Sequence, residues 1–133
     1  MVIPSFSFGN IALVNQAASL RTAKRHKAVF VSFDKKPTME EIKEKWASFK
    51  GVPQDLNLPS APKQFLNYFE EDNRPQTKLD RNLEGGMAVS IGRLRPDSQY
   101  DYKFVCLSHN TVRGAAGGAV LMAELLAAQG YMD

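Results

Sequence analysis

The segment from residue 107 to residue 126, "LSHNTVRGAAGGAVLMAELL", most strongly limits how this chain can fold. It begins as an apolar strand and continues as a helix, and its glycines and alanines gather where the two elements meet. Each glycine in a helix interior costs roughly 1 kcal/mol relative to alanine, so three glycines in one turn need a reason. The segment therefore predicts a strand-to-helix corner that another backbone or a ligand approaches closely.

Polar side chains precede the glycines at this corner. Asn110 or Thr111 can cap the helix, because each offers a side-chain oxygen to the free N–H groups of the first turn. Those N–H groups and the helix dipole also favour an anion. The spacing of Gly114, Gly117 and Gly118 matches neither G-x-G-x-x-G nor a P-loop. From the residues alone, tight packing and ligand binding both remain open.

Composition excludes several classes of protein. With 133 residues the chain suits one domain, and 44% hydrophobic residues can bury a core. No apolar run approaches the roughly 20 residues that a membrane span needs. One cysteine cannot form an internal disulfide, and one cysteine with two histidines cannot supply the usual four zinc ligands. We predict a chain with no metal site, no membrane span and a place in a reducing compartment.

Residues 1–27 differ in character from the remainder. No acidic residue precedes Asp34, and basic residues are clustered between Arg21 and Lys27. This stretch is compatible with a transit peptide, with a solvated basic arm, or with a basic contact to phosphate, nucleic acid or a membrane surface. We predict a boundary here: residues 1–27 as a basic arm that is disordered or unrelated to the rest, and residues 28–133 as the folded domain.

Within the domain, the clearest helix follows a short apolar strand at 28–33. Thr38 is a good N-cap with Glu41 three residues later, which is a capping box, and Ile42 and Trp46 recur at helical spacing. Two further strands, at 87–96 and 100–108, are joined by turn residues and are expected to form an antiparallel hairpin. Residues 63–71 could be strand or short helix. The closing helix is expected from about Thr111 to Gln129, with Gly130 after it.

At this point the residues resemble a known family. The phrases "LSHNTVRGAAGGAVLMAELL", "RPQTKLDRNLEGGMAVSIGRLR" and "LPSAPKQ" are similar to the C-terminal end of fungal and archaeal aspartate-semialdehyde dehydrogenases, and "AVFVSFDKKPTMEEIKEKWASF" fits the same domain. The resemblance runs from about residue 28 to the end. It implies an α+β domain with a mixed, largely antiparallel sheet and helices packed on one face, like the C-terminal domain of glyceraldehyde-3-phosphate dehydrogenase-like enzymes. The family's Rossmann domain, which binds NADP, is absent from this sequence.

The resemblance also implies a reaction. Family members are oxidoreductases that reduce β-aspartyl phosphate to L-aspartate 4-semialdehyde in threonine, methionine and isoleucine biosynthesis. A cysteine thiolate attacks the acyl phosphate and NADPH reduces the resulting thioester, while a histidine acts as acid and base. The nucleophilic cysteine belongs to the missing half, so we expect the chain to be a fragment that is inactive alone.

Site residues are carried over one by one. By resemblance, Asn110 and Thr111 lie beside NADP, and Asn110 holds its nicotinamide end. His26 is the candidate catalytic histidine, although Arg25 replaces the family's glycine and the spacing to the strand is shorter by about one residue. Cys106, between apolar neighbours on a strand, is expected to be buried and inert. His109 is expected to serve local structure.

Partners and location follow from the same family. The resemblance implies a homodimer or homotetramer formed through the sheet, a small-molecule substrate, no nucleic acid and a cytoplasmic enzyme. The alternative is a non-catalytic dimerisation or interaction module derived from that enzyme. A basic nucleic-acid binder is a weaker option, because the basic stretch lacks interleaved aromatic residues and any known motif.

Overall fold

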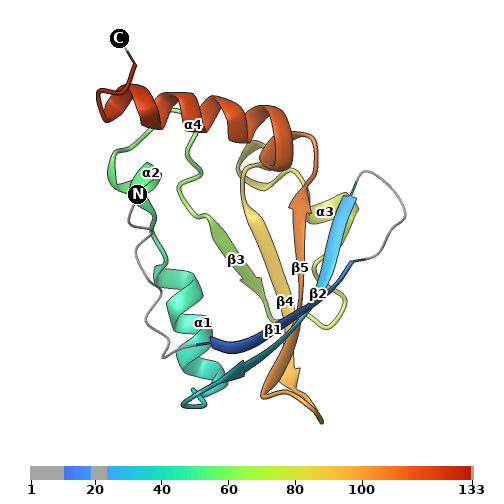
Figure 1. Cartoon of the computed structure of the whole chain (residues 1–133). Coiled ribbons are helices and arrows are strands. Elements are labelled where there is room, and N and C mark those ends of the chain that lie inside the picture. The colour runs from blue at the N-terminus through green and yellow to red at the C-terminus, as the bar shows by residue number, and fades with distance from the viewer. Residues whose placement is uncertain (1–10, 19–23, 133) are drawn as a thin grey trace.

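A five-stranded sheet forms the centre of the computed structural model, which describes residues 11–18 and 24–132 (Figure 1). Its strands are β1 (Ile11–Ala18), β2 (Lys24–Phe33), β3 (Leu66–Phe69), β4 (Val89–Pro96) and β5 (Tyr102–His109). They lie in the order β1-β2-β5-β4-β3, and only the β3–β4 pair is parallel. The expected mixed, largely antiparallel α+β sheet is confirmed, as is the hairpin of β4 and β5.

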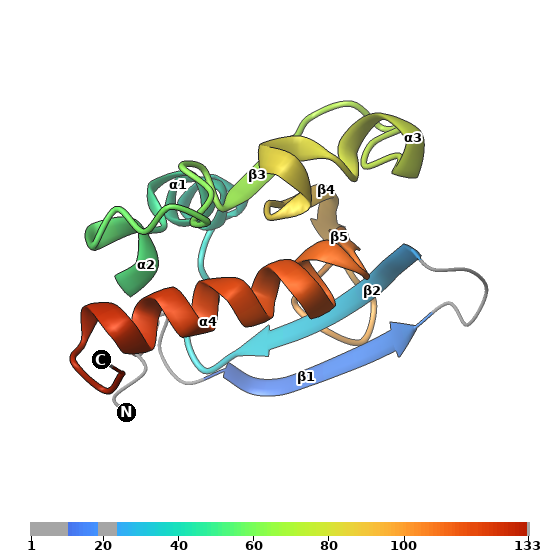
Figure 2. The same cartoon turned by 90° about the horizontal axis from the view of Figure 1, so that it is seen from above.

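The helices of the described residues are mostly short. They are α1 (Met39–Ser48), α2 (Val52–Asp55), α3 (Thr77–Asp80), the 3-10 turn η1 (Leu83–Gly86), the π-turn η2 (Val112–Ala116) and α4 (Gly117–Ala128). In both views α4 crosses one end of the sheet on the same side as α1 (Figure 2). None of these helices is long and apolar enough to cross a membrane.

The capping box predicted for α1 is present. The Glu41 N–H donates to Thr38 Oγ1 at 3.2 Å, and the Thr38 N–H donates to Glu41 Oε2 at 2.7 Å. These two bonds satisfy backbone donors that a helix end otherwise leaves unpaired. The capping box sets the first residue of α1. The apolar side of this helix, which carries Ile42 and Trp46, packs against the sheet.

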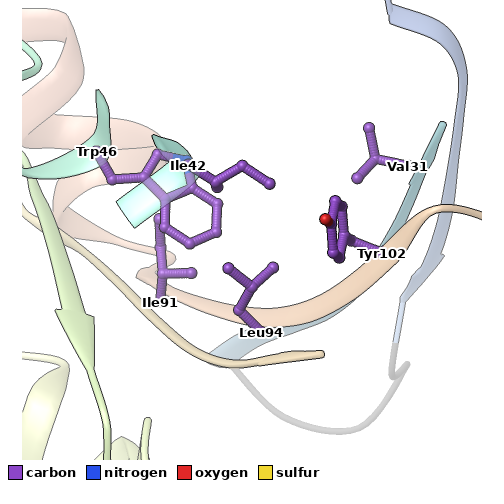
Figure 3. Packing of buried hydrophobic residues seen from close by; sticks show 6 residues of the cluster. All are labelled: Val31, Ile42, Trp46, Ile91, Leu94 and Tyr102. Atoms are coloured by element: carbon purple, nitrogen blue, oxygen red, sulfur yellow. The ribbon is translucent and has the colours of Figure 1, made fainter. Parts of the chain in front are cut away.

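The main core lies between α1 and one face of the sheet (Figure 3). Trp46 is 9% exposed, and its ring centroid lies 5.0 Å from that of Phe104 on β5 and 5.7 Å from that of Tyr68 on β3. The Tyr102 hydroxyl donates to the Pro37 carbonyl at 2.6 Å, which joins the core to the loop before α1. The buried members of this cluster are Val31, Ile42, Trp46, Ile91, Leu94 and Tyr102.

The loop that carries α3 covers part of the opposite face of the sheet, so the helices are not confined to one side. Gly92 on β4 has no room for a side chain, because a β-carbon there would collide with the backbone of Arg74. The carboxylate of Asp80, which is 2% exposed, accepts from Arg74 Nε at 2.9 Å and from the Gln76 N–H at 2.6 Å. This buried ion pair holds the loop against β4.

The sheet begins earlier than the predicted boundary at residue 28. β2 starts at Lys24, and β1 occupies Ile11–Ala18, so part of the predicted basic arm pairs in the sheet. Lys24 lies opposite His109 and Lys27 opposite Cys106 across the β2–β5 pair. Backbone pairing does not require apolar side chains, so the basic residues at the start of β2 concealed its first four positions. Residues 1–10 and 19–23, for which a basic arm is predicted, lie outside the described residues.

Candidate functional site

The predicted strand-to-helix corner exists, and it lies where β5 meets η2 and α4 (Figure 1). His109 ends the strand, Asn110 and Thr111 form the corner, and the helix begins at Val112. His109 and Asn110 are half-buried, whereas Thr111 is exposed. The end of a strand therefore presents two adjacent polar side chains at the surface.

The cap of this helix differs from the prediction. Thr111 stands at the N-cap position with helical backbone angles, and its side chain accepts no capping hydrogen bond. Instead, His109 Nδ1 accepts the Val112 N–H at 3.2 Å and lies 3.3 Å from Thr111 Oγ1. The histidine replaces the expected cap, which confirms its role in local structure and leaves the Asn110 side chain free of that task.

A wide first turn explains two of the three glycines. The Ala116 N–H donates to the Thr111 carbonyl at 3.0 Å, which is the i to i+5 bond of a π-helix. A β-carbon at Gly118 would lie 2.6 Å from the Arg113 oxygen, and one at Gly117 would lie 2.6 Å from Met87 Sδ. Gly114 is different, because a β-carbon there would make only ordinary contacts. Close packing therefore accounts for Gly117 and Gly118.

A groove lies beside the corner. The loop before β3, the η1 turn and the start of α4 form its walls. Glu84 Oε2 accepts the Lys63 N–H at 2.9 Å, which ties two of these walls together. Residues that line the groove include Ser60, Lys63, Gly85, Met87, Val112 and Gly117. The groove is open, and an acidic residue, Glu84, and a basic residue, Lys63, line it together with residues of the first turn of the helix.

Arg113 was not singled out by the sequence. Its guanidinium carbon lies 4.4 Å from the centroid of the Phe65 ring, and burial lowers the pKa of this side chain. Within the described ranges, no carboxylate forms an ion pair with it. Nothing in the sequence distinguishes this arginine from other basic residues, since its packing against Phe65 depends on the tertiary fold.

Comparison with known proteins decides which family this arrangement represents. The dimerisation domain of semialdehyde dehydrogenases matches residues 11–113. The chain belongs to the semialdehyde dehydrogenase family. The match also covers the extension of the sheet before residue 28.

Individual relatives of this chain support the same family assignment. The chain is 45% identical over 101 residues to the aspartate-semialdehyde dehydrogenase of Methanothermobacter thermautotrophicus, covering 74% of this chain and 29% of that protein. It is 49% identical over 98 residues to the enzyme of Schizosaccharomyces pombe, covering 72% of this chain and 28% of that protein. A malonyl CoA reductase (NADP) of Metallosphaera sedula is 44% identical over 110 residues, covering 81% and 31%. The chain therefore spans less than a third of the length of these relatives.

A solved structure shows the same fold. Aspartate semialdehyde dehydrogenase with NADP from Candida albicans superimposes with a TM-score of 0.72 at 36% identity, covering 82% of this chain and 31% of that one. The sequence match and the structural superposition therefore agree on the semialdehyde dehydrogenase family.

The structure does not bring His26 to the corner of this dimerisation domain. His26 lies opposite Leu107 in the β2–β5 register, whereas Asn110 follows three residues later. Three residues of strand correspond to roughly 10 Å. His26 instead contributes to the electrostatic field at Asp80 on the α3 side of the sheet. Its assignment as catalytic acid and base stays a prediction.

Cys106 is half-buried, less than expected from the sequence, and packs on the core face of β5. Burial raises the pKa of its thiol, although the positive charge of Lys27 opposes that effect. The side chain contacts the cluster that surrounds Trp46. A thiol with a raised pKa in apolar surroundings is a poor nucleophile.

Within the part of the chain that the structure describes, no three His, Cys, Asp or Glu side chains gather in a group that could hold a metal ion.

Proposed function

We propose that this chain is the C-terminal, substrate and dimerisation part of an NADP-dependent oxidoreductase that converts β-aspartyl phosphate to L-aspartate 4-semialdehyde. The observation that carries the proposal is the 45% identity over 101 residues and the 49% identity over 98 residues to an archaeal and a fungal aspartate-semialdehyde dehydrogenase. In that reaction a hydride from NADPH replaces the phosphate on the acyl carbon, and phosphate leaves. We place the enzyme in the cytoplasm, in amino-acid biosynthesis.

The chain's own contribution to this chemistry is to position the cofactor. NADPH would supply the hydride when it is bound. Asn110 would hold the carboxamide of the nicotinamide through its side-chain amide, and Thr111 would contact the same end. This assignment is supported by the exposure of Thr111 and by the absence of a capping bond from its hydroxyl. The groove beside η2 leaves room for a neighbouring domain to approach.

The chain on its own is not expected to turn over substrate. Its single cysteine is Cys106, and the raised pKa of that thiol disfavours nucleophilic attack. The described residues contain no doubly wound nucleotide-binding sheet. Catalysis would require a thiol and a dinucleotide site supplied by another polypeptide segment.

Dimer formation would use the sheet face opposite α1. On β2 and β5 this face carries Ala28, Phe30 and Val105, all half-buried. The α3 loop covers the β4 side of the same face, so an apolar strip remains next to β1. Such strips on a sheet fit a second copy of the same sheet. A homotetramer would need a further surface, for which the exposed Val120 and Met122 of α4 are candidates.

A second function has an observation in its favour. The relative from Metallosphaera sedula is a malonyl CoA reductase (NADP), and it is 44% identical to this chain. Both reactions reduce an activated carboxyl group beside a second carboxylate, so the fold of this part does not separate them. A non-catalytic dimerisation module is the remaining alternative.

A chimera tests the proposal. Residues 11–133 would replace the matching C-terminal segment of the Methanothermobacter enzyme, and NADPH consumption would be followed with β-aspartyl phosphate and with malonyl-CoA. Turnover of β-aspartyl phosphate within about tenfold of the parent enzyme is expected. A chimera that is folded by circular dichroism, dimeric and inactive with both substrates would contradict the enzymatic assignment and favour the module.

A further inference from the structure

The first turn of the closing helix is held by a histidine ring where a serine or threonine cap is usual. The first amides of any helix lack partners within the helix, and an unpaired buried amide is costly. Here the Val112 N–H donates to His109 Nδ1 at 3.2 Å, and no capping bond comes from Thr111. A nitrogen that accepts an N–H carries no proton itself. With Nδ1 as the acceptor of the Val112 N–H, the proton of the imidazole has its place on Nε2.

The ring is also fixed from the side. Gly86 has a backbone φ of +86°, and a β-carbon there would lie 3.3 Å from His109 Cδ2 and 3.2 Å from Val112 Cβ. The η1 turn thus packs its bare backbone against the imidazole and the first helical residue. Any residue larger than glycine at position 86 would displace one of them. The imidazole is held by a hydrogen bond on one edge and by packing on another.

The residues that the His109 ring contacts, Thr111 and Val112, lie at the corner between β5 and η2. Thr111 Oγ1 lies 3.3 Å from the same Nδ1 atom, and Asn110 is the residue between His109 and Thr111. Rotation of the ring away from Val112 would release the Val112 amide and the Thr111 hydroxyl together. The ring therefore contacts both residues that follow Asn110.

We propose that His109 is a positioning residue that sets the orientation of Asn110 and Thr111 by accepting the Val112 N–H through Nδ1. One consequence of this inference rests on the proposed function, namely that the two positioned side chains contact NADP. The hydrogen bond and the tautomer can be tested without any cofactor.

Two substitutions form a matched pair. In His109→Asn the side-chain oxygen occupies the place of Nδ1, since both atoms are three bonds from Cα. In His109→Gln the acceptor is one bond farther away and cannot reach the Val112 N–H in the same geometry. The two side chains are otherwise alike in polarity and in their hydrogen-bonding groups.

The first readout is amide exchange of the 133-residue chain, followed by NMR. Slow exchange of the Val112 amide is expected in the wild type and in H109N, and exchange about fivefold to thirtyfold faster is expected in H109Q, as for the loss of a helix cap. Long-range nitrogen spectra of the wild type should show a proton on Nε2 and none on Nδ1. Equal exchange in H109N and H109Q, or a proton on Nδ1, would overturn the proposal.

The second readout uses the active chimera. H109Q is expected to raise the KM for NADPH about tenfold with a smaller change in kcat, and H109N is expected to restore the KM. If the wild-type chimera is inactive but the exchange pattern holds, the proposed function fails and the role of His109 stands. If the chimera is active and both variants share the wild-type KM, the positioning role fails while the function stands.

Discussion

The carbonyl oxygen of Arg113 lies 2.6 Å from the position that a β-carbon on Gly118 would occupy. The π-turn brings this oxygen inward, so an alanine there must push the turn open. Gly118→Ala is expected to destabilise the chain by about 1–3 kcal/mol, as for other overpacked sites. Gly114→Ala is the matched control, because its β-carbon would make only ordinary contacts and alanine favours a helix. Urea unfolding that finds G118A as stable as G114A would contradict the packing role of Gly118.

Trp46 joins α1 to two strands of the sheet, β3 and β5. Trp46→Ala would remove its contacts with Phe104 and Tyr68 and is expected to cost about 3–5 kcal/mol of unfolding free energy. Trp46→Phe keeps an aromatic ring and should lose clearly less. Both values come from chemical denaturation followed by far-ultraviolet circular dichroism. Loss of less than about 1 kcal/mol in W46A would show that α1 does not depend on this residue.

The buried Asp80 offers a comparison with a surface ion pair. Asp80→Asn removes the charge that the Arg74 guanidinium and the Gln76 N–H bind, and the loss of these bonds to a buried acceptor is expected to cost about 1–3 kcal/mol. Glu70→Gln breaks the exposed Lys43–Glu70 pair and should change stability by less than about 1 kcal/mol. Similar losses in the two variants, measured by urea unfolding, would mean that the α3 loop is not anchored by Asp80.

The Asp97 carboxyl is expected to make the stability of the fold depend on pH. The Lys103 ammonium and the N–H groups of Gln99 and Tyr100 lower the pKa of this carboxyl from 3.8 to about 2. Because its pKa is depressed in the folded state, its stabilisation is present above about pH 4 and is lost as the pH falls toward 2. Thermal unfolding from pH 6 to pH 2 should show wild type converging on Asp97→Asn. Parallel curves across this range would contradict the shift.

Local signals in the sequence predicted much of the fold. The capping box at Thr38, the hairpin of β4 and β5 and the end of α4 near Gln129 depend on neighbouring residues. The strand at Leu66–Phe69 stayed ambiguous, because its four residues show no decisive period and its parallel partner β4 lies about twenty residues later in the sequence. The start of β2 at Lys24 was concealed by charged side chains whose backbones still pair with β5.

The candidate site was predicted less completely. The sequence located the corner at Asn110 and Thr111, yet it assigned the cap to the wrong side chain, since a histidine one residue earlier is not a usual cap. The stacking of Arg113 on Phe65 joins residues 48 positions apart, which no local pattern reveals. The separation of His26 from the corner follows from strand register, which the sequence did not specify.

Sedimentation equilibrium of the 133-residue chain tests the central claim, that this is a dimerisation domain, most directly. A monomer has a mass of 14.8 kDa, and we predict about twice that value at micromolar concentration. Val105→Glu, on the apolar strip, should shift the mass toward the monomer, while Ala119→Glu, on the exposed side of α4, should leave the dimer intact. A wild-type chain that is folded and remains at 14.8 kDa at the highest attainable concentration would contradict the account.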